Sequence, residues 1–369
     1  MTLDIGAGAL TVARMSTTCD SQPQSLPPVS VAVINYNGAT TLGPTLRSVL
    51  AQEGVTVSAV VLVDNHSPDD SVAWVRREFP SVRIIERPDN RGPNPARNEG
   101  LRAAGTDYVL IMDNDIVLAP DYLACLLRAS QDHPEAGALG GRINLYEQPD
   151  TVQYNGTDIH FAGEIALNRA ILAQPLRVAC VSAGAALIDR RKALQVGGFD
   201  EDFVFGWEDG DLTFRLSLAG FPCYAVSNAV CYHMKLKLKG RVKWVRYQTR
   251  NHWWFMIKNY DGRTLLLALP AILALQGCAA LFFLIKGQMV AFLAGTWDVL
   301  STARPVWRKH RHIQTFKRVS DADLLRGDRL DLPGGVSTTT WGRTMNAVLN
   351  VMFQLHWRLI RPALKARPS

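Results

Sequence analysis

The sequence predicts an α/β fold, in which a mostly parallel sheet has helices on both faces and is followed by membrane-associated C-terminal helices. Between residues 29 and 233, short apolar runs alternate with segments of helical periodicity, and strands alternating with helices in this way pair in parallel. Carboxylates follow directly after several of these runs, where parallel sheets bind their ligands. Residues 264–285 carry no charged side chain, which predicts the apolar C-terminal part.

The expected elements follow one another along the chain. Each expected strand is a short run rich in Val, Ile, Leu or Ala, and each expected helix repeats apolar residues three or four positions apart. The strands are expected at 29–34, 57–63, 82–85, 108–112, 137–145, 180–188, 222–226 and 230–233. The helices are expected at 40–51, 71–79, 95–104, 120–130 and 210–220. Residues 146–177 follow no regular pattern.

The chain of 369 residues has a formal net charge of +7 that is unevenly spread. Residues 1–234 hold 17 Lys and Arg against 27 Asp and Glu, whereas residues 235–369 hold 23 against 6. An acidic part joined to a basic part predicts two tasks. A basic surface suits nucleic acid or anionic lipid. The sequence has no nucleic-acid-binding motif, and its apolar stretch favours lipid.

Composition divides the chain into four parts. Residues 1–28 are rich in Ser, Thr, Gln and Pro and lack the pattern of a secretory signal, so we expect a flexible leader. Residues 29–260 are expected to form the α/β domain, 261–300 an apolar membrane-associated helical segment, and 301–369 a basic and amphipathic region. The six cysteines are scattered without a C-x-x-C pair, which indicates reduced thiols of a cytosolic domain.

The uncharged stretch 264–285 is long enough to cross a membrane, since a helix of this length extends about 33 Å. A single span, a re-entrant hairpin completed by residues 287–297, and a buried pair of core helices are all compatible with the pattern. Residues 341–361 are amphipathic and suit a membrane surface. In residues 235–254, Lys and Arg mix with apolar residues and tryptophans, which suits an anionic membrane or a diphosphate-linked lipid. A solvated loop or an RNA-binding patch is the alternative.

Two carboxylates follow the fourth expected strand. Asp113 and Asp115 are two positions apart, so in an extended segment they lie on one face and can meet one ligand. Carboxylate oxygens suit Mg²⁺ or Mn²⁺, which keep positions open for phosphate oxygens. A solvated acidic turn is the alternative, but the position after a parallel strand favours a metal–diphosphate site.

Polar residues also follow the other expected strands. Asp64 ends the second strand, where it either binds a nucleobase or ribose or forms an Asx turn. Asn35 and Asn37 follow the first strand and either contact a ligand or close their own turn. Further candidates for contacts with a nucleotide are Asn90, Arg97, Asn98 and Asn114.

A second acidic cluster lies about a hundred residues after the first. Trp207 and Glu208 suit contacts with a sugar acceptor, because an aromatic face packs under C–H groups while a carboxylate binds hydroxyls. The adjacent Asp209 is a candidate general base, and partial burial would raise its proton affinity. His233 closes a short apolar strand and is either a packed core residue or a third metal ligand.

Taken together, these residues resemble the family 2 glycosyltransferases with the GT-A fold, over about residues 29–255. The branch most similar to this chain is the rhamnosyl- and galactofuranosyltransferase-like one, which builds bacterial surface glycans. The chain has no Q-x-x-R-W motif, which favours addition of one or a few sugars over polymerisation. The matching motifs are Asn35-Tyr36-Asn37-Gly38, Asp64-Asn65-His66-Ser67, Asn90-Arg91-Gly92, Arg97-Asn98, Asp113-Asn114-Asp115, Gly197-Gly198-Phe199-Asp200-Glu201, Trp207-Glu208-Asp209-Gly210-Asp211 and His233.

The resemblance implies an inverting transfer from a UDP- or dTDP-sugar. Asp64 would contact the base, and Asp113 and Asp115 would hold the donor diphosphate through Mg²⁺ or Mn²⁺, with His233 completing the metal site. Asp209 would take the proton of the acceptor hydroxyl.

The acceptor would be a lipid-linked or cell-surface glycan, contacted by Trp207 and Glu208, at the cytoplasmic face of the cell membrane. The alternatives are a sugar-phosphate nucleotidyltransferase and an inactive membrane scaffold of the same fold. A nucleotidyltransferase would need a cationic loop after the first strand, and Asn35-Tyr36-Asn37-Gly38 supplies no cation.

Overall fold

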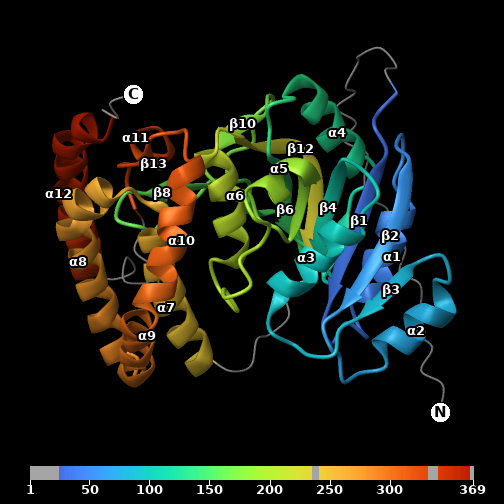
Figure 1. Ribbon diagram of the computed structural model, residues 1–369, viewed down its shortest axis with the longest axis horizontal. Helices are drawn as coiled ribbons and strands as arrows, with labels where there is room; N and C mark the ends of the chain where they lie inside the picture. Colours follow the sequence, from blue (N-terminus) through green and yellow to red (C-terminus); the bar gives the residue numbers. More distant parts are fainter. Residues whose placement is uncertain (1–24, 235–240, 331–339, 366–369) are drawn as a thin grey trace.

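The computed structural model describes residues 25–234, 241–330 and 340–365, and it divides into a sheet-containing domain and a C-terminal helical bundle (Figure 1). The strands of the first part are β1 (Val29–Asn35), β2 (Val57–Asp64), β3 (Arg83–Glu86), β4 (Tyr108–Asp113), β5 (Ile116–Leu118), β6 (Ala138–Leu145), β7 (Gln148–Tyr154), β8 (Thr157–His160), β9 (Ile165–Leu167), β10 (Leu176–Val178), β11 (Ala185–Asp189) and β12 (Cys223–His233). Its helices are α1 (Leu42–Leu50), α2 (Ser71–Glu78), α3 (Pro93–Ala103), α4 (Tyr122–Asp132), α5 (Arg190–Gln195) and α6 (Glu208–Leu218).

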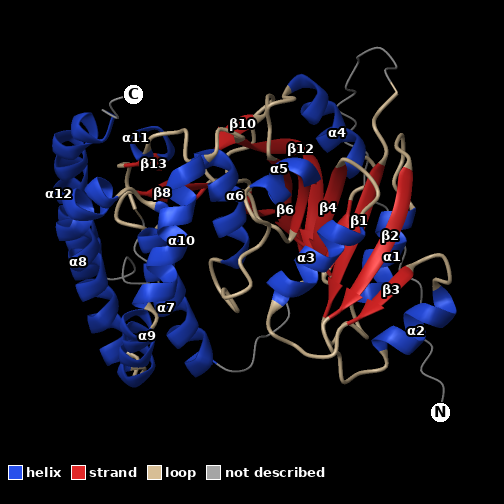
Figure 2. Cartoon of the chain, viewed as in Figure 1, coloured by secondary structure: helices blue, strands red, loops and turns tan. Residues whose placement is uncertain are grey.

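The main sheet confirms the predicted α/β class. Its strand order is β10-β12-β6-β11-β4-β1-β2-β3, with β5 paired to β12 and β7 to β6 (Figure 2). Strands β4, β1, β2 and β3 are parallel, and so are β6 and β12, whereas β11 runs antiparallel to both of its neighbours. The sheet is therefore mixed but mostly parallel.

Both faces of the sheet are covered, because alternate side chains of each strand point to opposite faces. From β1, Val31 and Val33 enter a core with α1, α2 and α4. Ala32 and Ile34, the residues between and after them, enter a second core beneath α3, α5 and α6. This double burial explains why the strands read as continuous apolar runs in the sequence.

The region 146–177, for which the sequence predicts no pattern, contains β7, β8, β9 and β10. The reason is exposure: Gln148 to Thr151 of β7 lie at the surface, so no apolar alternation marks the strand. The two strands expected at 222–226 and 230–233 are one strand, β12, with a register shift between Val226 and Val230.

The C-terminal part is helical and packs on α6. A third hydrophobic core lies between α6 and the C-terminal helices and includes Phe214 and Leu218 of α6, Phe255 and Trp357. The basic run predicted to meet a membrane falls partly on residues 235–240, which lie outside the described residues. The elements of the C-terminal part are α7 (Arg241–Asn259), α8 (Gly262–Ile285), α9 (Met289–Ser301), α10 (Ala303–Phe316), α11 (Asp321–Leu324), β13 (Leu325–Arg326) and α12 (Thr340–Lys365). Within the described ranges, α8 is the one helix long and apolar enough to cross a membrane.

Candidate active site

The predicted site residues gather at one edge of the sheet. Asn35, Asp64 and Asp113 end β1, β2 and β4. The strand register pairs Asn35 with Asp64 and Ile34 with Asp113, so these strands finish side by side. Ligands of open α/β sheets bind at such an edge.

A hydrogen-bond network joins the loops after β1 and β2. The buried Asn35 donates through Nδ2 to Asp64 Oδ1 at 2.7 Å, and Asp64 also accepts from the hydroxyl of Ser67 at 2.6 Å. Asn114 Nδ2 donates to Asn35 Oδ1 at 2.7 Å. Asn37 is exposed, with a φ of 54°, and its backbone N–H donates to Ser67 Oγ at 3.1 Å. These bonds fix the two loops at the mouth of the sheet.

Asp113 is paired with a buried cation. Its Oδ1 lies 3.1 Å from Nη2 of Arg97, which is 3% exposed and also donates to Asn94 Oδ1. Burial raises the pKa of Asp113 above its usual value, with Asp115 adding to the shift and Arg97 opposing it. Burial acts to lower the pKa of Arg97, but the nearby carboxylates outweigh it and the net shift is upward. The guanidinium therefore stays charged beside the expected diphosphate position.

Asn98 and Asn90, two of the expected nucleotide contacts, have different surroundings. Asn98 is buried; its Nδ2 donates to the Phe199 carbonyl and to Glu201 Oε1, and its Oδ1 accepts from the Phe199 N–H. Both ends of this amide thus hold the 199–201 loop. Asn90 is exposed, and its Oδ1 accepts from the side chain of Asn65.

Two of the three expected metal ligands lie together. Oδ2 of Asp115 lies 3.3 Å from Nε2 of His233, because the end of β12 pairs with β5 directly after Asp115. Gln153 Oε1 lies 3.0 Å from the other ring nitrogen, Nδ1. An amide oxygen only accepts, so Nδ1 carries a proton and Nε2 is the nitrogen that faces the carboxylate.

This arrangement suits a divalent cation, since a nitrogen lone pair and a carboxylate oxygen face each other only with a proton or a cation between them. Within 25–234, 241–330 and 340–365, however, no three His, Cys, Asp or Glu side chains converge on one point. Asp113 instead turns to Arg97. Asp115 and His233 therefore fit as a pair of protein ligands, which leaves the remaining positions of Mg²⁺ or Mn²⁺ to other oxygens.

Asp209, the expected base, lies in the first turn of α6. Its Oδ2 accepts from the hydroxyl of Ser182 at 2.9 Å, and its Oδ1 accepts from the Gly210 N–H at 2.8 Å. Gly184 separates this pair from Asp113: a β-carbon there would lie 3.3 Å from Ser182 Oγ and 3.5 Å from Asp113 Oδ2. The base is thus held in a fixed orientation, close to the end of β4.

Glu208 and Trp207 precede the base. Burial, together with the charge of Asp209, raises the pKa of Glu208 to about 7, and its Oε2 is buried without a hydrogen-bond partner in the described structure. Trp207 adopts a left-handed backbone with a φ of 66° and is largely buried. One face of its ring stacks on His252 of α7, with centroids 5.2 Å apart.

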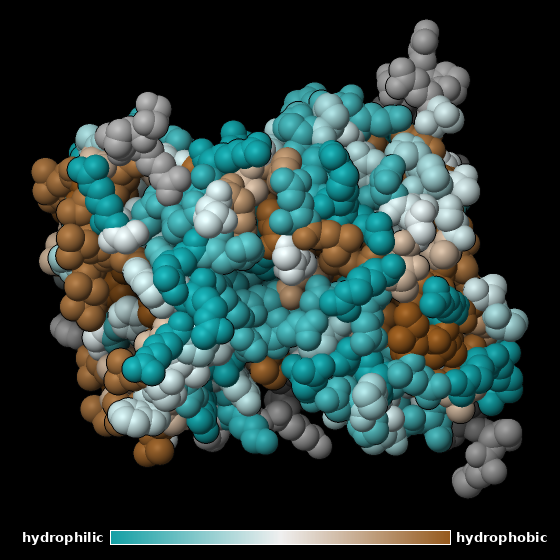
Figure 3. All heavy atoms as spheres, viewed as in Figure 1, coloured by the Kyte–Doolittle hydropathy of each residue, from teal (hydrophilic) through white to brown (hydrophobic). Residues whose placement is uncertain are grey.

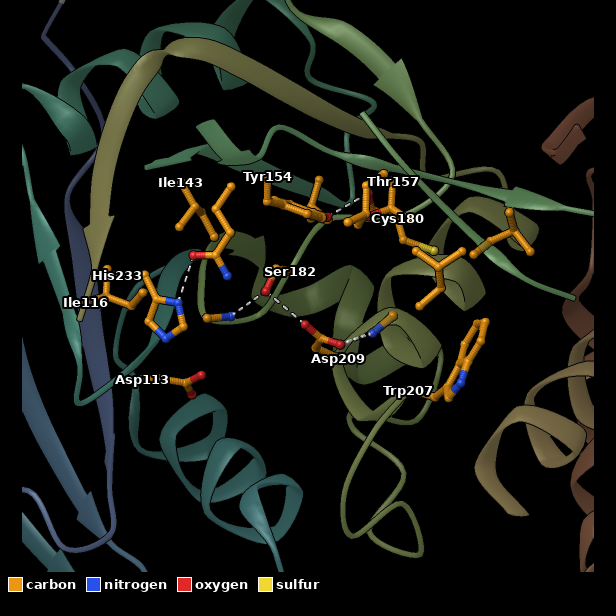
Figure 4. Close-up of a pocket in the computed structure, with 17 residues that line it drawn as sticks. Asp113, Ile116, Ile143, Tyr154, Thr157, Cys180, Ser182, Trp207, Asp209 and His233 are labelled. Carbon is orange, nitrogen blue, oxygen red and sulfur yellow. Dashed lines mark hydrogen bonds between the residues drawn. The ribbon is translucent and has the colours of Figure 1, made fainter. Parts of the chain in front are cut away.

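A cavity of about 260 Å³ joins these groups. Figure 4 shows Asp113, His233, Ser182 and Asp209 around this space, with Trp207 at one end. Two side chains of the cavity, Ser182 and Gln153, were not found by sequence reasoning. They lie 27 and 80 positions from the residues that they contact, and no motif marks them.

The remaining wall of the cavity is mostly apolar, and five of its residues come from the region 146–177, for which the sequence predicts no pattern. It is formed by Ile143, Tyr154, Thr157, Ile159, Ile165, Leu167, Cys180 and Val181. A space with carboxylates at one end and apolar and aromatic side chains at the other fits a polar ligand bound beside a sugar or lipid moiety.

The chain is similar in sequence to known glycosyltransferases. Residues 30–195 match the family described as Glycosyl transferase family 2. The chain is 37% identical over 145 residues to the succinoglycan biosynthesis protein ExoO of Rhizobium meliloti, covering 39% of this chain and 39% of that protein. It is 28% identical over 232 residues to an N-acetylglucosaminyl-diphospho-decaprenol L-rhamnosyltransferase of Mycobacterium tuberculosis, covering 54% of this chain and 75% of that one.

A solved structure shows the same fold. The crystal structure of GalNAc-T7 with UDP, GalNAc and Mn²⁺ has a TM-score of 0.56 and 17% identity, covering 68% of this chain and 52% of that one. The chain thus spans less than two thirds of ExoO and of GalNAc-T7.

Proposed function

Because residues 30–195 match the family described as Glycosyl transferase family 2 and the chain has the GT-A fold, we propose that it is an inverting, metal-dependent glycosyltransferase. It moves a sugar from a UDP- or dTDP-sugar to a hydroxyl of a lipid-linked or cell-surface glycan. The observation that carries the proposal is the position of Asp209, which shares one cavity with Asp113 and His233 and is oriented by Ser182.

In the proposed reaction, Asp209 takes the proton of the acceptor hydroxyl. The oxygen then attacks the anomeric carbon on the face opposite the departing nucleoside diphosphate, so that the new C–O bond forms as the bond to the diphosphate breaks. Ser182 donates to one carboxylate oxygen and Gly210 to the other, which holds Asp209 in a single orientation before the proton moves.

The donor lies along the edge of the sheet in this proposal. Asp64, with Asn35, Asn37 and Asn114 around it, sits where the nucleoside binds. Asp115 and His233 would hold the metal, with Asp113 beside them. The metal, when bound, neutralises charge that develops on the leaving diphosphate. Contacts of Asn90 with the nucleotide remain part of the proposal, while Asn98 acts through the loop that it holds.

Arg97 and Asp113 form a charged pair that a bound diphosphate would share. Arg97 is buried, and its Nη2 lies 3.1 Å from Asp113 Oδ1. A guanidinium at this position would attract the negative oxygens of the diphosphate, and Asp113 would then be available as a further oxygen ligand.

The acceptor reaches the cavity on the side of Trp207 and Glu208. A relative named for transfer to a diphospho-decaprenol carrier supports a lipid-linked acceptor. The strongly basic C-terminal part and the apolar helix α8 support a location at the cytoplasmic face of an anionic membrane.

Replacing the base tests the proposal directly. Asp209→Asn keeps the shape of the side chain but accepts no proton, so kcat should fall by about 10³-fold while binding of the nucleotide-sugar is unchanged. Asp132→Asn, an exposed carboxylate at the end of α4, is the matched control and should keep full activity. Unchanged turnover by Asp209→Asn would reject Asp209 as the base.

The metal is tested by binding rather than by turnover. UDP or dTDP should raise the melting temperature in the presence of Mn²⁺, and a chelator should remove most of that shift. Asp115→Asn should weaken the Mn²⁺-dependent part alone. An equal shift with and without chelator would show that the nucleotide binds without a metal.

A further inference from the structure

Three helices of the C-terminal bundle carry an exposed apolar stripe. On each helix most of the exposed apolar residues lie three, four or eight positions from the next, which gathers them on one face. The stripes are formed by Leu266, Leu269, Leu273, Leu281 and Leu284 on α8, by Val290, Leu293, Trp297 and Leu300 on α9, and by Val348, Val351, Met352, Leu355 and Leu359 on α12. Figure 3 shows apolar residues gathered at the end of the molecule where these helices lie.

The opposite faces of the same helices form the core of the bundle. Ala268, Ala271 and Ile272 of α8 are buried, as are Phe353 and Trp357 of α12. Each helix is therefore apolar on both sides, with protein against one side and nothing in the described structure against the other. Soluble surfaces rarely expose a contiguous apolar area of this extent, so the stripes indicate a partner.

Basic residues accompany the stripe on α12. Arg358, Arg361 and Lys365 are exposed and spaced by three and four positions, so they form a row along one flank of the helix. Arg361 and Arg326 also line a small recess between α12 and β13. An apolar face with a cationic flank is the pattern of a helix that lies in the plane of an anionic membrane.

From these observations we propose that α8, α9 and α12 form a platform that inserts into one leaflet of an anionic bilayer, with α8 lying along the membrane rather than crossing it. The inference deepens the membrane location proposed above but does not depend on the identity of donor or acceptor. The arginines of α12 meet lipid phosphates, while the leucines of the stripes enter the acyl region.

Because α8 contacts α7 and α12, it could cross a membrane only if the helical bundle rearranged. His356 of α12 lies 2.9 Å from the Leu267 carbonyl, and Gln276, in the middle of α8, lies 3.0 Å from His252 Nδ1 of α7. After Gly287 the chain returns as α9, which packs closely on α7: a β-carbon at Gly295 would lie 2.5 Å from the Arg246 carbonyl oxygen. A helix crossing the membrane would have to leave these partners.

A second copy of the chain fits the platform less well than a membrane does. Residues 235–369 carry 23 Lys and Arg against 6 Asp and Glu, so two copies meeting through this part would bring like charges together. An anionic lipid surface complements the same charge.

Vesicle binding by the full chain tests the platform. Wild-type protein should sediment with phosphatidylcholine vesicles that contain phosphatidylglycerol, and more weakly with phosphatidylcholine alone. Leu355→Glu with Leu359→Glu should weaken binding to both by at least about tenfold. Arg358→Glu with Arg361→Glu should weaken mainly the binding to anionic vesicles. Arg76→Glu with Arg77→Glu, the same charge change on exposed residues of α2, is the matched control and should bind as wild type does.

Two controls distinguish failure of the membrane platform from failure of the proposed glycosyl transfer and from dimer formation. The melting temperature with and without UDP and Mn²⁺ shows whether each variant folds and binds a nucleotide, so a failed platform leaves the proposed transfer intact. If wild-type protein forms a stable dimer in solution and does not bind vesicles, the proposed membrane platform is wrong. It is also wrong if the leucine variants bind vesicles as tightly as the control.

A labelling experiment distinguishes lying on the membrane from crossing it. Gln288→Cys, in the turn between α8 and α9, is made with Cys19→Ala and Cys278→Ala, since the other four cysteines are buried. In spheroplasts of a bacterial host, a membrane-impermeant maleimide should label Cys at 288 only after the membrane is opened. Labelling of intact spheroplasts would place the turn on the outer side and overturn the proposal.

Discussion

The Asp209 carboxylate is held by one local group, the N–H of Gly210, and by one distant group, the hydroxyl of Ser182, and this explains which of its properties are visible in the sequence. Its position after an aromatic run marks it as an acid at the start of a helix. Its orientation depends on Ser182, whose hydroxyl is 2.9 Å from Oδ2 although the two residues are 27 positions apart. The acid could be predicted from the local pattern, whereas its partner became visible only in the folded chain.

In the proposed reaction, Ser182 acts by orienting Asp209, the proposed base. Ser182→Ala should lower kcat by about tenfold or more, since a hydrogen bond to a charged group is worth about 1.5–3 kcal/mol, and leave the KM for the donor near its wild-type value. Ser182→Thr keeps the hydroxyl and should restore most of the rate. Steady-state kinetics with varied donor separates the two constants. Loss of donor affinity at constant kcat would contradict the orienting role.

We propose that Gln153 orients His233, the expected metal ligand, through its contact with Nδ1. Gln153→Leu removes the acceptor for the Nδ1 proton and should weaken Mn²⁺ binding by about 10–100-fold. Gln153→Glu keeps an acceptor and should bind Mn²⁺ at least as well. Free Mn²⁺ measured by electron paramagnetic resonance reports the affinity without turnover. If Gln153→Leu binds Mn²⁺ as wild type does, His233 is not oriented in this way.

At the level of elements, the predictable part of the fold is the part buried on both faces. β1, β2 and β4 are predicted at nearly their observed bounds, because their apolar runs are continuous. The region of β7 to β10 could not be predicted, because its strands are short and partly exposed. This region nevertheless supplies much of the cavity wall, so the apolar wall was the part of the candidate site least accessible from the sequence.

His160, at the end of β8, makes the contact between β8 and α12 sensitive to acid. The residue is buried between Phe161 and Phe353, and burial lowers its pKa from 6.5 to about 3. Below pH 6.5 the unfolded chain therefore binds a proton at His160 that the folded chain does not bind until the pH is near 3. The contribution of His160 to the free energy of unfolding is therefore fully present above pH 6.5 and is lost as the pH decreases toward 3.

Replacing His160 should remove the loss of stability that its protonation causes at low pH. His160→Asn keeps an acceptor for the Ala162 N–H but does not titrate. Between pH 7 and about 4.5, wild-type protein should lose about 2 kcal/mol more unfolding free energy than the variant does. Urea denaturation at both pH values measures the difference, and His312→Asn, on the surface of α10, should behave as wild type. Equal acid sensitivity of His160→Asn and wild type would refute this role.

On the scale of the whole molecule, a buried charge network ties the helical bundle to the segment that carries the base. Nζ of Lys258 on α7 lies 2.7 Å from Asp200 and 2.6 Å from Asp211, two positions after Asp209. Lys309 of α10 also reaches Asp200, at 2.5 Å. The sequence predicts an α/β domain at residues 29–260 followed by separate C-terminal segments, but these contacts make the helical bundle a structural support of the segment that carries Asp209.

Lys258→Met tests that linkage, because it leaves two buried carboxylates without their shared cation. Removing one partner of a buried ion pair costs about 3–5 kcal/mol, so the variant should unfold at clearly lower urea concentration. Hydrogen exchange should also show faster opening of α6 and α7 together, since the network joins them. Lys243→Met, an exposed lysine of the same helix, should change neither measurement. If exchange in Lys258→Met quickens in α7 while α6 keeps its wild-type protection, the bundle does not support the segment that carries Asp209.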